Sequence, residues 1–432
     1  MFQSTQFHNL ISLPDWNNHV FVLHSHSPNK PILIGLGCEE IYSVESASGK
    51  SLEELQIWLN QNEDWAFGFI AYDTKNAIEN LSTQHPNTTG FADLQFVIPQ
   101  VVIQIKNEII EFKKNNSSYS EEALIRLIHQ NEFNPVSEEH IELQPRITRD
   151  EYIRAIHHLL DHIQRGDIYE VNYCQEFFGT HQLRDPYGLW AKLNKLTEAP
   201  FSAYMQSQSL HLLCASPERF MQKTNDVIIS QPIKGTIRRG RTNEEDNRLK
   251  NELQNNQKER SENVMIVDLV RNDLSHIATK GSVEVKELFG IYSFKTVHHM
   301  ISTVQARIKD ECTFTDILRA LFPMGSMTGA PKISAMQLIE QYEHNRRGIY
   351  SGSVGYITPE GDFDFNVVIR SLVYNSEKSY LSCCVGSAIT SQCDPQKEYE
   401  ECLLKAEALF KSLRTHEPNT TSSDSQIART AN

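Results

Sequence analysis

Apolar residues in the first part of the chain occur in short runs separated by Gly, Pro and Asn. Runs rich in β-branched and aromatic residues at 20–24, 31–36, 65–72 and 94–105 are typical of β-strands. Between them, the spacing of apolar residues around 52–61 predicts a helix. The first hundred residues are therefore expected to form mainly strands.

Two helix starts are predicted from capping-box spacings. Ser118 and Glu121 have this spacing ahead of the apolar sequence ALIRLI, so a helix is expected from about Glu121. Thr148 and Glu151 repeat the spacing, and apolar residues at helical intervals follow until Gly166.

The second helix start divides the chain into an N-terminal region, 1–145, and a larger region, 146–414. Strand patterns resume at 168–178, and the last helix is predicted over 396–413. Strands cluster with short connections and do not alternate regularly with helices, so we expect an α+β fold of largely antiparallel sheets flanked by outer helices. The polar residues 415–432 are expected to be disordered.

The composition limits the classes of partner. The 432 residues include 41 Lys and Arg against 55 Asp and Glu, and the net charge of −14 argues against binding to nucleic acid or to an anionic membrane. Taken alone, this charge also disfavours an anionic ligand. No apolar run approaches the roughly 20 residues that span a bilayer, and the N-terminus lacks a secretory pattern, so a cytoplasmic protein is expected. The eight cysteines include no C-x-x-C pair and are interpreted as small buried apolar residues.

Two predicted helices each carry a pair of glutamates three residues apart, on one helix face. The pairs are Glu259 with Glu262 and Glu398 with Glu401. A single such pair usually lies on a solvated helix face. Glu262 and Glu401, however, directly precede apolar runs, so both acids border buried faces. If the helices face each other, close carboxylates repel by roughly 4 kcal/mol at ~4 Å with an effective dielectric near ~20. A divalent cation would relieve this repulsion, and oxygen ligands without His or Cys favour Mg²⁺.

Lys234 lies in VIISQPIKGTIR, a strand sequence that Pro232 interrupts and Gly235 reopens. A lysine is most often a surface residue that buries only its aliphatic chain and keeps its ammonium in water. In this apolar strand the ammonium could instead be desolvated, which would lower its pKa and leave a neutral amine able to attack carbon. Glu218 follows a Ser-Pro turn at the end of another strand, a position suited to an acid that transfers protons.

Further segments have features of an anion-binding site. Residues 322–332 lead into a helix through Gly and Pro, so free N–H groups could cradle an anion, with a purely structural cap as an equal alternative. Arg370 lies among strand hydrophobics and needs a carboxylate from the protein or from a ligand. Tyr350 follows a glycine turn, and the small residues 386–388 would let a ligand approach the backbone.

The order of several short motifs resembles that of the chorismate-utilising enzymes, the family of the anthranilate synthase and aminodeoxychorismate synthase large components. The resemblance extends from about 146 to 413 and implies a fold like that of anthranilate synthase component I. The ordered set is specific for the family and consists of SPERF, PIKGT, ENVMIVDLVRNDL, VHHMIS, TGAPK, RGIYSG, IRS and the E-x-x-E-x-x-x-K of 398–405.

Within this family, the residue between PI and GT is typically Lys in aminodeoxychorismate synthases and Ala in anthranilate synthases. Lys234 therefore implies Mg²⁺-dependent amination of chorismate at C4, which gives 4-amino-4-deoxychorismate for 4-aminobenzoate and folate synthesis. The resemblance implies that Lys234 adds at C2 while the C4 hydroxyl leaves, that Glu218 is the general acid and base, and that His299 lies beside the ring.

The resemblance also implies the ligand contacts. Glu262 and Glu401 match Mg²⁺ ligands, with Glu259 and Glu398 in supporting positions. Because chorismate is a dicarboxylate, the net charge argues only against large polyanions. The residues expected to hold chorismate are Gly235, Thr236, Tyr350, Arg370, Gly386, Ser387 and Ala388.

Two positions depart from the family pattern. Ala388 replaces a glycine, although its N–H can still donate. Glu170 stands where isochorismate and salicylate synthases carry a lysine that activates water, and where Gln is otherwise common. The absence of that lysine counts against water as the nucleophile. Region 1–145 matches more weakly and lacks the Leu-Leu-Glu-Ser segment tied to tryptophan feedback.

No glutamine amidotransferase module is recognised, so ammonia is expected from a separate amidotransferase subunit or from solution. Two alternative functions stay open. One is anthranilate synthase component I, which aminates C2 and releases pyruvate, and Lys234 counts against it. The other is a non-catalytic chorismate-binding protein, which the full set of candidate metal and lysine groups disfavours.

Overall fold

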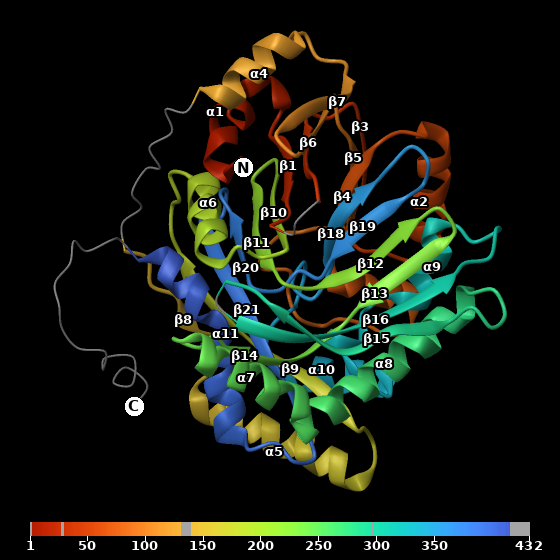
Figure 1. Ribbon diagram of the computed structural model, residues 1–432, viewed down its shortest axis with the longest axis vertical. Helices are drawn as coiled ribbons and strands as arrows, with labels where there is room; N and C mark the ends of the chain where they lie inside the picture. The colour runs from red at the N-terminus through yellow and green to blue at the C-terminus, as the bar shows by residue number, and fades with distance from the viewer. Residues whose placement is uncertain (1, 27–29, 131–139, 296, 415–432) are drawn as a thin grey trace.

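The computed structural model describes residues 2–26, 30–130, 140–295 and 297–414. Two large sheets face each other, with helices on their outer sides (Figure 1). Every strand pairing within the described residues is antiparallel. The predicted α+β class with largely antiparallel sheets is therefore confirmed. The tail 415–432, predicted to be disordered, lies outside the described residues.

The first sheet has eleven strands, drawn from both ends of the chain. They are β1 (His19–His24), β2 (Ile32–Leu36), β6 (Val101–Lys106), β7 (Ile109–Asn115), β8 (Gln144–Pro145), β9 (Glu170–Thr180), β10 (Phe201–Ser207), β11 (Leu210–Ser216), β17 (Gly329–Ala330), β20 (Ser371–Asn375) and β21 (Tyr380–Thr390). Their order is β17-β9-β21-β20-β11-β10-β1-β2-β6-β7, and β8 pairs with β9.

The second sheet has ten strands. They are β3 (Glu40–Val44), β4 (Ala66–Ile70), β5 (Leu94–Ile98), β12 (Arg219–Thr224), β13 (Val227–Gln231), β14 (Ile233–Arg238), β15 (Glu284–Ser293), β16 (Val297–Arg307), β18 (Ser353–Ile357) and β19 (Phe363–Asn366). Their order is β14-β16-β13-β12-β19-β18-β4-β5-β3, and β15 pairs with β16.

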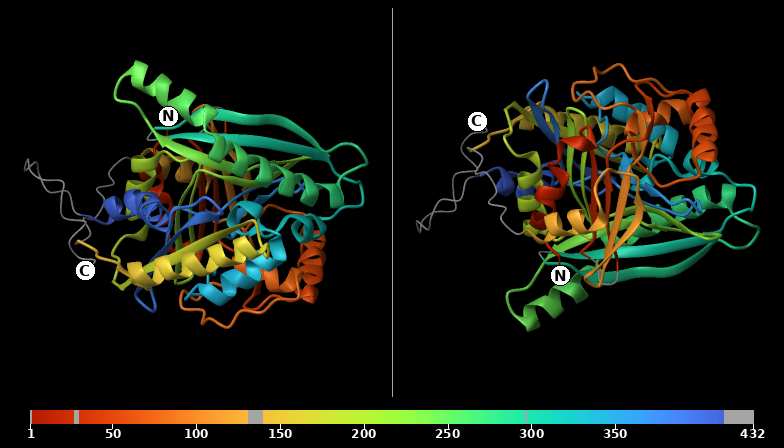
Figure 2. Two further views of the ribbon diagram at one scale, coloured as in Figure 1. Left: turned by 90° about the horizontal axis from the view of Figure 1, so that it is seen from below. Right: turned by 90° about the horizontal axis from the view of Figure 1, so that it is seen from above.

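The helices are α1 (His8–Ile11), α2 (Gly49–Asn62), α3 (Lys75–Ile78), α4 (Glu121–His129), α5 (Arg149–Arg165), α6 (Pro186–Thr197), α7 (Asn243–Asn255), α8 (Gln257–Ile277), α9 (Phe314–Leu321), α10 (Lys332–Tyr342) and α11 (Pro395–Leu413). Helices α5, α6 and α11 pack against the first sheet, and α2, α8 and α9 against the second. Figure 2 shows α7, in green, projecting from the body. Among the helices of the described ranges, none is both long and apolar enough to cross a bilayer.

A core of large apolar side chains fills the space between the two sheets. The rings of Phe21 on β1 and Phe67 on β4, for example, are 5.6 Å apart. In the first sheet β1 pairs with β10, and in the second β4 pairs with β18. The chain segments on either side of the predicted boundary at 145–146 therefore share both sheets and this core.

The two predicted helix caps have different outcomes. Thr148 caps α5, since its hydroxyl accepts from the Glu151 N–H and the Glu151 carboxylate accepts from the Thr148 N–H, as predicted. Helix α4 also begins where predicted, but its cap is Ser120, which accepts from the Ala123 N–H. The predicted box at Ser118 is therefore wrong, because that serine lies outside the first turn.

Candidate active site

The chain crosses between the two sheets at two adjacent places. Strand β11 leads directly into β12 of the other sheet, and β19 leads back to β20. The two connections are bonded to each other, from the Val367 N–H to the Glu218 carbonyl and from the Ala215 N–H to the Arg370 carbonyl. This double crossing brings Glu218 and Arg370 into one neighbourhood between the sheets.

Lys234 lies at a bulge in β14, where the interrupted strand pattern predicted a bend. Strands β13 and β14 pair with β16 in one register as far as Ile233, and the register shifts by one residue before Thr236. Gly235 makes the bend with a φ of +90°, and a Cβ there would lie 3.1 Å from Glu259 Oε2. A residue other than glycine would be strained in this backbone conformation.

The Lys234 ammonium is buried and forms an ion pair with Glu170 Oε1, at the start of β9. Burial alone would lower the pKa of this lysine, but the charges of Glu170 and then Glu262 outweigh burial and raise the pKa. The predicted lowering of the lysine pKa is therefore wrong for the resting site. The sequence did not reveal the pairing, because Glu170 lies 64 residues away along the chain.

Glu218 is a second acid beside this lysine. Its Oε1 accepts a hydrogen bond of 2.6 Å from the Ser326 hydroxyl, and its side chain is buried. Burial raises the pKa of Glu218 to about 7, against the opposing effects of Ser326 and Lys234. A carboxyl with this pKa can both give and take a proton near neutral pH. The geometry thus suits the predicted proton transfer, which stays a prediction.

The four glutamates predicted to bind a metal lie on α8 and α11, with a lysine between two of them. Lys258 Nζ lies 3.8 Å from Glu262 Oε1 and 3.4 Å from Glu398 Oε1. Glu401 pairs with Lys405 at 2.8 Å. Within the part of the chain that the structure describes, no three acidic, His or Cys side chains gather closely enough to form a metal site. The Mg²⁺ site therefore stays a prediction.

The donor set nevertheless fits a divalent cation. Glu262 Oε1 is buried and accepts no hydrogen bond from the described residues. Burial raises the pKa of Glu262 to about 7, which reports the cost of an incompletely neutralised carboxylate there. A cation in place of the Lys258 ammonium would meet carboxylates from two helices, and Mg²⁺ prefers such oxygen ligands.

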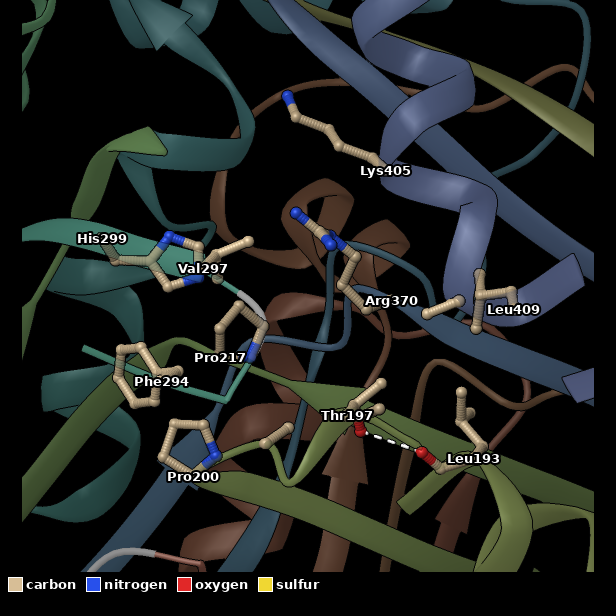
Figure 3. Close-up of a pocket in the computed structure, with 13 residues that line it drawn as sticks. Leu193, Thr197, Pro200, Pro217, Phe294, Val297, His299, Arg370, Lys405 and Leu409 are labelled. Carbon is tan, nitrogen blue, oxygen red and sulfur yellow. Dashed lines mark hydrogen bonds between the residues drawn. The ribbon is translucent and has the colours of Figure 1, made fainter. Parts of the chain in front are cut away.

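A cavity between α6, β16 and α11 has a polar end and an apolar end (Figure 3). The cations Arg370 and Lys405 line the polar end together with His299, and Leu193 and Pro200 lie at the other end. Burial lowers the pKa of Arg370, and no protein carboxylate in the described ranges forms an ion pair with it. Glu401 is near enough to raise the pKa of Arg370, and the ligand carboxylate expected for this arginine stays a prediction.

His299 and Tyr350 border the same region. His299 Nδ1 lies 2.8 Å from Thr236 Oγ1, its partner across the β14–β16 pairing. Burial, followed by the nearby Arg370, lowers the pKa of His299 to about 3, so the ring is neutral. Tyr350 is buried, with its hydroxyl 3.5 Å from Cys174 Sγ, and is close enough to Arg370 to influence its pKa.

Strand β21 has an edge beside α11 that pairs with no strand of the described residues beyond Ser382. Lys405 Nζ donates to the Gly386 carbonyl at 3.0 Å, so Gly386 faces this edge. Because backbone groups alternate along a strand, Ala388 faces the same edge and Ser387 faces β9. Two of the three predicted backbone contacts therefore point toward the site side of β21.

The glycine-rich segment 322–332 contains a short strand just before α10, and its predicted anion binding stays a prediction. Gly329 and Ala330 form β17 and pair with β9, and a Cβ on Gly329 would lie 2.1 Å from the Glu170 carbonyl oxygen. Ser326 in the same segment reaches Glu218. This segment therefore supports the two acids beside the lysine.

A model of the chorismate binding enzyme family matches residues 20–411. The chain belongs to this family. The fold is similar to that in a crystal structure of anthranilate synthase component I from Streptococcus pneumoniae, with a TM-score of 0.77 at 24% identity, covering 89% of this chain and 93% of that chain. The fold implied by the sequence motifs is therefore confirmed.

Relatives in the family carry two different names. A protein named "Probable aminodeoxychorismate synthase, chloroplastic" from Oryza sativa is 42% identical over 267 residues, 61% of this chain but only 30% of that protein's length. Aminodeoxychorismate synthase component 1 of Escherichia coli is 32% identical over 84% of this chain and 81% of its own. Anthranilate synthase component 1 of Aquifex aeolicus is also 32% identical, over 81% of this chain and 74% of its own.

Three residues in the site of this chain were given no role by the sequence analysis. Lys258 and Lys405 each stand four residues from a candidate metal ligand, a spacing at which oppositely charged side chains meet on a helix. This spacing could have identified both. Ser326 gave no such signal, since its partner Glu218 lies 108 residues away.

Proposed function

We propose that this chain catalyses the Mg²⁺-dependent amination of chorismate at C4 and forms 4-amino-4-deoxychorismate, a precursor of 4-aminobenzoate. The observation that carries the proposal is Lys234, a buried amine at a bulge that pairs with Glu170 and is influenced by the charges of Glu262 and Glu218. Family membership and the similarity to aminodeoxychorismate synthase component 1 support it.

In the proposed reaction, the deprotonated amine of Lys234 forms a bond to C2 of the ring. The two ring double bonds shift, the C4–O bond breaks, and Glu218 protonates the departing hydroxyl to give water. Ammonia then bonds to C4, the double bonds shift back, and the bond between C2 and the lysine nitrogen breaks. Glu218 takes the surplus proton from the new C4 ammonium. A carboxyl with a pKa of about 7 suits both of its steps.

The remaining groups hold the substrate. Arg370, which has no ion pair with the described protein carboxylates, would bind one substrate carboxylate together with Tyr350 and the N–H groups of Gly386 and Ala388. The neutral His299 ring, placed by Thr236, would pack beside the substrate without adding charge.

The acidic cluster would hold Mg²⁺. Glu262 and Glu401 are the expected ligands, with Glu259 and Glu398 in support, and Lys258 has to withdraw from between Glu262 and Glu398. Its side chain is 39% exposed and can move into solvent. When bound, the cation supplies positive charge that neutralises the glutamates and attracts an anionic substrate.

We further propose that ammonia reaches this site from a separate glutamine amidotransferase subunit. The relatives in Escherichia coli and Aquifex aeolicus are both named component 1, which supports a two-component enzyme. Ammonium salt is expected to replace the partner in vitro, because the amination groups all lie on this chain.

Amination at C2 with loss of pyruvate is the second candidate. The 32% identity to an anthranilate synthase component 1 favours it as much as the equal identity to the Escherichia coli relative favours the first. Lys234 separates the two, because C2 must stay free for ammonia in the second reaction, whereas the lysine lies ready to occupy it in the first.

Product analysis tests the proposal. The purified chain is incubated with chorismate, Mg²⁺ and ammonium chloride, and the products are separated by chromatography and identified by mass and NMR. We expect 4-amino-4-deoxychorismate without pyruvate. Anthranilate with equimolar pyruvate would overturn the proposal in favour of C2 amination, and unchanged chorismate that still binds would indicate a non-catalytic protein.

A further inference from the structure

The contact between Glu170 and Lys234 joins the two sheets inside the site. Glu170 begins β9 of the first sheet and is 1% exposed, and Lys234 lies in the bulge of the second sheet and is 8% exposed. The backbone of Glu170 is fixed on both sides, since it pairs with Ala330 of β17 and with Thr390 of β21. The carboxylate is therefore held in place against the amine.

A lysine ammonium has no lone pair, so Lys234 must lose a proton before it can bond to carbon. Three acids influence its charge from three elements: Glu170 on β9, Glu218 at the crossing and Glu262 on α8. Within the described residues, Glu170 alone forms an ion pair with the ammonium.

The other two acids are engaged elsewhere. Glu218 accepts a hydrogen bond from Ser326 and has the role of proton donor to the C4 hydroxyl in the proposed reaction. Glu262 faces Lys258 on its own helix. In contrast, the second oxygen of Glu170, Oε2, is buried and accepts no hydrogen bond from the described part of the chain. Lys234 is therefore the cation that pairs with this carboxylate within the described residues.

We propose that Glu170 is the base that takes the proton from the Lys234 ammonium when the amine attacks, and the acid that returns it when the amine leaves. This inference rests on the function proposed above. In the first step the N–H bond breaks, an O–H bond forms on Glu170, and the freed nitrogen lone pair forms the bond to C2. In the last step the C2–N bond breaks, and the Glu170 O–H returns its proton to the nitrogen. No other reactant is required.

The test compares Glu170→Gln with a matched control, Glu176→Gln. Glu176 lies on the same strand, is also buried and also forms an ion pair, with Arg146 at 2.6 Å, but is about 20 Å farther along β9. We expect Glu170→Gln to lower kcat for C4 amination at pH 7 by about 100-fold or more, with little change in KM for chorismate. Glu176→Gln is expected to stay near the wild-type value.

The pH dependence distinguishes a base from a structural role. Without Glu170, the lysine proton must leave to solvent, so the ratio of wild-type to variant kcat is expected to fall as the pH rises from 7 to 9. A loss of equal size at every pH would overturn the inference. A variant as active as the wild type at pH 7, or more active, would also overturn it, because Glu170 would then only restrain the lysine.

Two further measurements distinguish loss of the base from misfolding and from a different reaction. If circular dichroism shows that Glu170→Gln does not fold, Glu170→Asp replaces it. Because the aspartate carboxylate is one methylene farther from the lysine, we expect a smaller loss of kcat with the pH profile of the wild type. Full activity of Glu170→Asp would contradict the inference. Wild-type product analysis separates the two proposals. A wild type that aminates C2 would overturn the proposed function and this inference with it, whereas an unaffected Glu170→Gln in an enzyme that aminates C4 would overturn this inference alone.

Discussion

The lysine side and the acidic side of the site are built in different ways. On the lysine side, Lys234 is 8% exposed and pairs with an acid from the opposite sheet, and a backbone bulge fixes its place. On the acidic side, Lys258 is 39% exposed and lies between Glu262 and Glu398, held by side chains alone. The Lys234–Glu170 ion pair is enclosed by the two sheets, whereas the ion pairs of Lys258 lie between two helices at the border with solvent.

This difference indicates which charge is permanent and which can be exchanged. Removing one partner of an enclosed ion pair leaves an uncompensated buried charge, so Lys234 and Glu170 are fixed parts of the site. The Lys258 ammonium is partly exposed, so it can move into solvent when a cation neutralises Glu262 and Glu398 in its place. The lysine side therefore suits a covalent nucleophile, and the acidic side suits a cation that binds and leaves.

The largest expected effect tests the fixed side. Lys234→Ala removes the proposed nucleophile and is expected to lower C4 amination by about 1,000-fold or more, while Mg²⁺ binding measured by calorimetry is retained. Lys286→Ala, an exposed lysine on β15, is the control and is expected to match the wild type. Undiminished C4 amination in Lys234→Ala would remove this lysine from the chemistry.

The next effect tests the exchangeable side. Glu262→Gln is expected to weaken Mg²⁺ binding by at least about tenfold. Lys258→Met should instead strengthen it, because no ammonium then competes for the two carboxylates. Calorimetric titration with MgCl₂ measures both, with Lys286→Met as the matched control. Unchanged Mg²⁺ affinity in both variants would mean that the cation binds elsewhere.

A smaller effect concerns stability against pH on the fixed side. The folded pKa of Glu218 is about 7 and its ordinary value is 4.5, so between these values the folded state holds more protons than the unfolded state. The contribution of Glu218 to stability is therefore complete below pH 4.5 and is lost as the pH rises through 7. Glu218→Gln is expected to flatten this decline in the free energy of unfolding, measured with urea from pH 5 to 8. An equally steep decline in the variant would contradict the assignment.

The smallest expected effect separates backbone strain from crowding at the bulge. Gly235 and Gly281 both have a positive φ, but a Cβ would lie 3.1 Å from Glu259 Oε2 at Gly235 and would meet no atom within 4 Å at Gly281. Both alanine variants are expected to lose about 1 kcal/mol of stability from the backbone conformation. Gly235→Ala is expected to lose more, and some activity as well. Equal losses of stability in the two variants, measured by thermal unfolding, would show that the Glu259 side chain moves aside without cost.

The sequence predicted those parts of the fold that depend on local patterns. The strands with apolar runs, such as 94–105, and the α5 start at Thr148 were found where expected. The edge strands β3 and β7 were not clearly identified, because they are half exposed and polar residues alternate through them. The α4 cap was misplaced because Ser118 and Ser120 both precede the helix, and their spacing to later residues does not decide between them.

The site was predicted as a set of residues but not as a set of contacts. Motif order identified Lys234, Glu218 and the four glutamates, and the double crossing of the sheets explains why such distant segments meet. The sequence could not give the partner of Lys234, because the pairing with Glu170 depends on how two sheets face each other. For the same reason it gave the wrong direction for the lysine pKa, since burial was visible in the pattern and the opposing charge was not.

The most direct test of the central claim is a covalent intermediate on Lys234. Wild-type chain is mixed with chorismate and Mg²⁺ without ammonia, quenched in acid and examined by intact mass and peptide mapping. We expect an added mass of chorismate less one water on Lys234. This added mass should be absent from Lys234→Ala and lost when ammonium is supplied before quenching. Modification of a different residue, or C4 amination by Lys234→Ala at the wild-type rate, would contradict the central claim.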